Sequence, residues 1–177
     1  MKKILIGCLS LFLLAACKKE VSELPPATQT AAGTFGAKVN GTFWVPKGFG
    51  PFPANDILEA RLAGPTEILI NARNFASSPN ETEFEILIAG VTGPGTYQLN
   101  NTVPRGGSLS YGYYVKRNLT PQNEWITSST STGTVEITKL DLVNHIVSGT
   151  FQFNALNLYN TPEPLVITEG RFDLKLQ

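Results

Sequence analysis

The residues most able to do chemistry in this sequence are one cysteine and a few carboxylates. Cys17 directly follows Leu14-Ala15-Ala16, at the end of a largely apolar stretch that begins at Ile4. A thiolate is a strong nucleophile, and a thiol can be converted into a thioether. The small residues before it leave room for a peptidase. The pattern therefore predicts that the chain is cut before Cys17 and that its thiol receives a lipid.

The residues before Cys17 have the layout of a secretory signal. Lys2 and Lys3 give a positive start, and an apolar stretch and small residues follow. A membrane-spanning helix needs about 20 apolar residues, so this stretch is too short to remain as an anchor. A Leu, two small residues and a cysteine also match the bacterial lipobox. We therefore expect residues 1–16 to be a signal peptide. An ordinary cleaved signal with an incidental cysteine is the alternative.

Lipidation of Cys17 would fix the location of the protein. Each buried methylene contributes about 0.8 kcal/mol, so one acyl chain binds a membrane marginally, whereas three bind almost permanently. Residues 18–33 have few large apolar groups and contain Pro25-Pro26, so they cannot form a core. We expect residues 17–33 to be a lipidated cysteine and a flexible tether. The predicted location is the bacterial outer membrane, on its periplasmic or cell-surface side.

A second candidate chemistry rests on paired carboxylates. Glu81, Glu83 and Glu85 alternate with apolar residues, so on a strand they share one face, about 6.6 Å apart along the backbone. Inverting glycosidases use carboxylates at comparable separations, but one of them needs a pocket that raises its pKa. We expect these three on an open, solvated face. A carbohydrate-active enzyme that uses Asp56, Glu59 or Glu85 is the alternative.

Other reactive groups are scarce. Cys8 leaves with the signal peptide, and His145 is the only histidine, so no cluster of His or Cys ligands is possible. The 14 basic and 14 acidic residues are balanced, which gives no reason to expect nucleic acid. The sequence predicts no catalytic constellation, no metal and no cofactor.

Three aromatic residues suggest a binding surface. Tyr111 and Tyr114, in "YGYYVK", and Trp125 are candidates because exposed rings near loops can stack on sugars or peptides. The predicted partner is a glycan or an envelope protein. Core packing of the same rings is an equally consistent alternative.

The elements that must position these residues are strands. "VSGTFQFNA" (147–155) and "GRFDLKL" (170–176) alternate apolar and polar residues, as half-buried strands do. Asn40-Gly41, Gly64-Pro65 and residues 141–144 predict hairpin turns. We expect residues 34–177 to form one all-β domain, an antiparallel β-sandwich of about eight to ten strands. A partly open β-barrel is the alternative.

Five segments carry a family resemblance: "GAKVNGTFWVP" (36–46), "GTYQL" (95–99), "GTVEITKLD" (133–141), "VSGTFQFNA" (147–155) and "ITEGRFDLKL" (167–176). With the lipobox, the chain resembles a group of small bacterial envelope lipoproteins of unknown function. The resemblance implies a lipid-anchored, β-rich domain and brings no catalytic residues. The expected function is therefore a noncatalytic binding or accessory module at the envelope.

Overall fold

A computed structural model describes residues 21–48, 57–76, 80–101, 109–117, 123–159 and 163–177. The described chain is all-β, and none of it forms a helix long and apolar enough to span a bilayer. Its strands are β1 Thr34–Val39, β2 Thr42–Trp44, β3 Leu58–Gly64, β4 Glu67–Asn74, β5 Glu81–Ile88, β6 Gly95–Leu99, β7 Tyr111–Arg117, β8 Asn123–Ile126, β9 Gly133–Asp141, β10 Ile146–Asn157 and β11 Leu165–Lys175.

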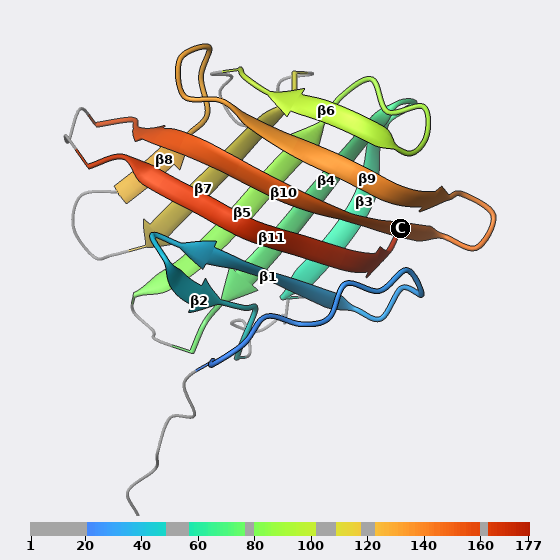
Figure 1. Cartoon of the computed structure of the whole chain (residues 1–177), viewed down its shortest axis with the longest axis horizontal. Helices are drawn as coiled ribbons and strands as arrows, with labels where there is room; N and C mark the ends of the chain where they lie inside the picture. Colours follow the sequence, from blue (N-terminus) through green and yellow to red (C-terminus); the bar gives the residue numbers. More distant parts are fainter. Residues whose placement is uncertain (1–20, 49–56, 77–79, 102–108, 118–122, 160–162) are drawn as a thin grey trace, which may run out of the picture.

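The strands form two packed layers, which cross at an angle in Figure 1. Sheet A has the order β2-β1-β11-β10-β9-β6. Sheet B has the order β3-β4-β5-β7-β8, and the last two residues of β10 pair with β8 at its edge. All paired strands are antiparallel. The predicted antiparallel sandwich is confirmed.

Long strands join the two layers at opposite corners. β10 pairs with β9 and β11 through most of its length and with β8 at its end, so it belongs to both sheets. At the other corner, the Gln177 amide donates to the Ala60 carbonyl of β3 at 2.8 Å. Among the described strands the path still ends at β2 and β3 and does not close into a barrel. Eleven strands exceed the predicted eight to ten, and β2 and β8 are only 3 and 4 residues long.

The three predicted turns connect neighbouring strands. Asn40 and Gly41 have φ of 47° and 81°, the positive values of a type I′ turn, and they join β1 to β2. Gly64 is the last residue of β3, and Pro65 begins the turn to β4. Residues 142–145 connect β9 to β10. These turns set the registers that bring the inward faces together.

The core lies between the sheets and is centred on aromatic rings. Phe84 of β5 is fully buried, and its ring centroid lies 4.7 Å from that of Trp44 and 4.9 Å from that of Tyr114. Phe35 and Phe151 of sheet A pack on it from the other layer. The inward alternation read from the sequence is confirmed, since its inward apolar residues all join this core: Val147, Phe151, Phe153 and Ala155 of β10, and Phe172 and Leu174 of β11.

Candidate functional site

The predicted carboxylates lie on the outer face of sheet B, but that face is not open. Glu83 is 4% and Glu85 6% exposed, so the expectation of a solvated carboxylate face is wrong for these two. A second apolar cluster covers this face: Leu87, Tyr111, Tyr113, Val115 and Ile126. Alternation correctly separated the two faces of β5, but it could not show that the outer face is buried as well.

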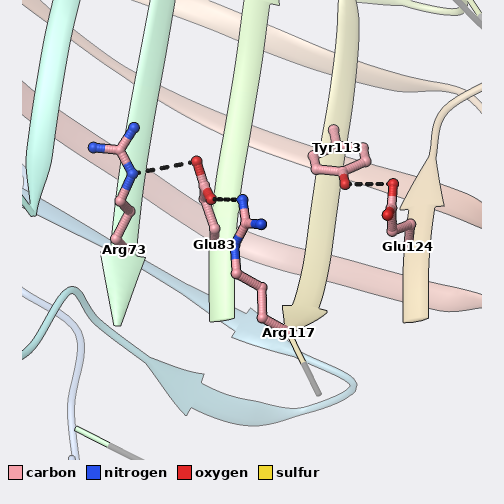
Figure 2. Close-up of polar contacts among 5 residues, drawn as sticks. All are labelled: Arg73, Glu83, Tyr113, Arg117 and Glu124. Atoms are coloured by element: carbon pink, nitrogen blue, oxygen red, sulfur yellow. Dashed lines mark hydrogen bonds and ion pairs between the residues drawn. The ribbon is translucent and has the colours of Figure 1, made fainter. Parts of the chain in front are cut away.

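Glu83 lies between two arginines from the neighbouring strands (Figure 2). Arg73 stands directly opposite it on β4, and Arg73 Nε lies 3.3 Å from Glu83 Oε1. Arg117 of β7 is its diagonal neighbour, and Arg117 Nη2 lies 2.6 Å from Glu83 Oε2. A buried carboxylate requires partners of this kind, because losing one would leave an uncompensated charge. The triad therefore holds three strands together.

Two tyrosines engage two further carboxylates of this face. The Tyr111 hydroxyl donates to Glu85 Oε1 at 2.5 Å. The Tyr113 hydroxyl donates to Glu124 Oε2 at 2.6 Å, as Figure 2 shows. Hydrogen bonds to an ionised acceptor are short and strong. Each phenol thus binds a carboxylate across neighbouring strands.

This arrangement differs from a glycosidase site, in which two carboxyl groups flank one scissile bond. Here Glu83 engages arginines and Glu85 engages a tyrosine. Glu59 of β3 forms an ion pair with Arg61, with the nitrogen and oxygen 3.3 Å apart. Asp56 lies outside the described residues. The contacts of Glu83 and Glu85 link neighbouring strands, so the geometry of the carboxylates fits a structural role in sheet B better than acid–base catalysis.

The three aromatic residues predicted to bind a ligand are buried. Tyr111 is 1% exposed and belongs to the outer cluster of sheet B, whereas Tyr114 and Trp125 belong to the core between the sheets. The expectation of exposed rings is therefore corrected: alternation turns Tyr114 and Trp125 into the core, and neighbouring side chains bury Tyr111 on the outer face of sheet B. Burial raises the pKa of Tyr114 to about 12, although a hydrogen bond with Thr82 opposes that rise.

A buried carboxylate that the sequence did not mark fixes the N-terminal segment (residues 21–33). Asp173 of β11 is 1% exposed. It accepts hydrogen bonds from five residues: Thr28, Thr30, Ala31, Ala32 and Ser148. Burial acts to raise the pKa of Asp173, but these donors outweigh it and hold the pKa well below its ordinary value.

Part of the predicted tether, residues 17–33, contacts the sandwich. Thr28, Thr30, Ala31 and Ala32 donate hydrogen bonds to Asp173 of β11. The predicted signal peptide and Cys17 lie outside the described residues.

The outer face of sheet A is polar and exposed. Two shallow hollows of about 490 and 400 Å³ adjoin on it and share Thr134 and Gln152. Glu136, Asn154 and Arg171 also line them. In the described part of the chain, no hydrogen bond involves the side chains of Thr134, Gln152 or Asn154. In the sequence, this surface was indicated by the polar residues that alternate with apolar ones in "TFQFNA" (150–155).

Within the described ranges, no three or more His, Cys, Asp or Glu side chains are grouped to hold an ion. His145 lies exposed in the turn before β10.

Comparison with known proteins places the chain in a family. No curated protein and no solved structure matches it. A family model described as a domain of unknown function, DUF6252, matches residues 31–173. The match begins among the residues bound by Asp173 and ends at Asp173 itself, so it covers nearly all of the sandwich. The chain belongs to the DUF6252 family.

Proposed function

We propose that this protein is a lipid-anchored lipoprotein of the bacterial outer membrane and that its sandwich is a noncatalytic binding module. The proposal that the sandwich is a binding module rests on the polar side chains of the outer face of sheet A. Its hydroxyl and amide side chains are exposed or half-buried on paired strands, and the side chains of Thr134, Gln152 and Asn154 make no hydrogen bond within the described chain. On sheet B, by contrast, the carboxylates discussed above all engage arginines or tyrosines.

The anchoring part of the proposal rests on the lipobox and on chain length. Ten residues separate Cys17 from Thr28, whose hydroxyl donates to Asp173. Eleven steps along the chain reach about 40 Å at full extension. A lipid on Cys17 would therefore hold the sandwich close to the bilayer surface.

Metabolic labelling tests the anchor. In cells fed radiolabelled palmitate, the wild-type chain should carry label and sediment with membranes. Cys17→Ala should lose both, because it lacks the thiol that accepts the lipid. The control is Cys8→Ala, which alters the other cysteine and should label normally. Equal labelling of the wild type and Cys17→Ala would contradict the proposal.

The chemistry of the sheet A face favours a neutral, polyhydroxylated ligand such as a glycan. Threonine hydroxyls and the amides of Gln152 and Asn154 both donate and accept hydrogen bonds, which suits sugar hydroxyls. Glu136 and Arg171 have opposite charges and line the same hollow, and Glu169, which also lines it, forms an ion pair with Lys38. The charges of this surface are therefore largely balanced. No described observation favours the alternative of a carbohydrate-active enzyme.

A glycan array with the mature Cys17→Ala chain tests this ligand class. We expect binding to a subset of glycans, weakened more than about tenfold in a variant with Gln152→Ala and Asn154→Ala, since each lost hydrogen bond contributes about 1 kcal/mol. Asn80→Ala, an exposed amide at the start of β5, is the matched control and should bind normally. A silent array, or equal binding by all variants, would refute the glycan assignment.

A further inference from the structure

An apolar groove of about 560 Å³ lies where the N-terminal segment meets the sandwich. Phe35, Val45, Ile57 and Leu58 are among its apolar lining residues. Its volume falls in the range of ligand-binding pockets, about 300–1,000 Å³. The groove is distinct from the polar hollows of sheet A, with which it shares no lining residue. Its chemistry suits an aliphatic ligand.

The N-terminal segment supplies one wall of this groove. Glu23, Leu24 and Pro25-Pro26 line it. Pro25 lies so close to β1 that a Cβ atom on Gly36 would come within 2.7 Å of Pro25 Cδ. Its carbonyl oxygen also accepts a hydrogen bond from Arg171 Nη1 at 3.4 Å. Together with the bonds to Asp173, these contacts hold the wall in place.

We infer that this groove holds one of the acyl chains carried by Cys17, an inference that rests on the proposed lipidation. Glu23, in the groove wall, is six residues from Cys17, which corresponds to at most about 20 Å of extended chain. The lipid is therefore tethered within reach of the groove. The remaining acyl chains stay available for the bilayer, and two chains suffice for stable anchoring.

The physical reason for occupancy is the cost of apolar surface in water. The apolar lining of the groove gains free energy when an acyl chain displaces water from it, whereas the acyl chain loses little on leaving the equally apolar bilayer. The tether also raises the effective concentration of this chain at the groove above that of any lipid in solution. The tether therefore favours the protein's own acyl group over a lipid that arrives from elsewhere.

Photocrosslinking in intact cells tests the inference. Cells are fed a palmitate analogue with a diazirine on its alkyl chain and are illuminated, and the crosslinked peptides of the purified protein are mapped by mass spectrometry. We expect adducts within one polypeptide, between the lipid on Cys17 and the peptides that contain Val45 or Ile57. Val45→Asp, which puts a charge in the groove, should reduce these adducts more than about fivefold.

Two further variants keep the test decisive. Val143→Asp alters a residue that is 87% exposed in the β9–β10 turn, and it should leave the adducts unchanged. Val45→Trp fills the groove without a charge and should also reduce the adducts, which covers the case in which Val45→Asp fails to fold. Circular dichroism confirms the fold of each variant.

The outcomes separate this inference from the proposed anchoring. A wild-type chain that carries the label but forms adducts only with phospholipids or with another polypeptide overturns the groove assignment and leaves the anchor intact. A wild-type chain without label overturns both. Adducts in the groove that persist in both Val45 variants also overturn the assignment.

Discussion

At the scale of single residues, Asp173 binds the N-terminal segment to β11, a role that its place in the sequence does not indicate. The alternation of β11 places the Asp173 side chain on the other face of the strand from Phe172 and Leu174. A charged residue on that face would normally contact water. Asp173 is instead buried beneath residues 28–32, which come from the other end of the chain and donate to its carboxylate. A sequence pattern reports local periodicity, so it could not reveal a partner about 140 positions away.

Replacing Asp173 with Asn tests this role through pH. Because its pKa is lowered in the folded state, the unfolded chain binds more protons as pH falls below about 4, the ordinary Asp value, and stability decreases there. Asp173→Asn should lower the free energy of unfolding by about 2–4 kcal/mol at pH 7. It should also remove the part of the acid-induced loss that Asp173 contributes.

Urea unfolding from pH 2.5 to 7 measures both effects. Glu136→Gln, an exposed carboxylate on the outer face of sheet A, is the control and should follow the wild type. Parallel stability curves for the wild type and Asp173→Asn would contradict the assigned role.

Because sequence patterns report only local periodicity, they predicted the faces of the candidate-site residues but not their burial. That Glu83 and Glu85 share a face was predictable from a period of two, as was the separation of Tyr114 from Tyr111. Their burial was not, because it depends on tyrosines and arginines that strand pairing brings from β4 and β7. Single residues were assigned to the correct face, but their environment required the assembled sheet.

At the scale of elements, close contacts between strands depend on residues without side chains. Gly133 of β9 stands opposite Phe153 of β10. A Cβ atom at Gly133 would lie 2.1 Å from Phe153 Cβ and 2.4 Å from the Gln152 carbonyl oxygen. Since one of these atoms belongs to the backbone, the clash could not be relieved by a rotamer change alone. Gly133 therefore allows β9 and β10 to pair at this position.

A single methyl group tests this packing. Gly133→Ala should lower the free energy of unfolding by about 1–3 kcal/mol, the usual effect of overpacking a tight site. Gly93→Ala is the matched control, because nothing lies within 4 Å of the added Cβ, and it should change stability little. Thermal unfolding of both variants gives the comparison. A Gly133→Ala chain as stable as the wild type would show that the strands can separate without cost.

The elements themselves were largely predictable, because turns and alternation are local signals. Asn40-Gly41 specified a hairpin through two residues that tolerate positive φ, and that hairpin is present. The membership of β10 in both sheets was not predictable. Its apolar alternation is continuous across the corner, so nothing in the pattern marks where β8 replaces the partners of sheet A.

At the scale of the whole molecule, the sandwich has two outer faces of different character. The outer face of sheet B carries buried apolar groups and charges that are paired with one another. The outer face of sheet A carries exposed hydroxyl and amide groups over two hollows. The sequence predicted the sandwich but assigned the binding surface to aromatic residues that are buried. The number and alternation of the strands could not show which of the two outer faces is exposed to water.

The pairing of β1 with β11 has a consequence for the order of folding. A ribosome releases the amino end first, but β1 finds its long partner only in the last strand of the chain. Before then β1 has only the 3-residue β2 beside it, and an isolated two-stranded hairpin is marginally stable at best. The nascent chain therefore stays incompletely folded until β11 emerges from the ribosome. The native sandwich can form only after β11 has been synthesised.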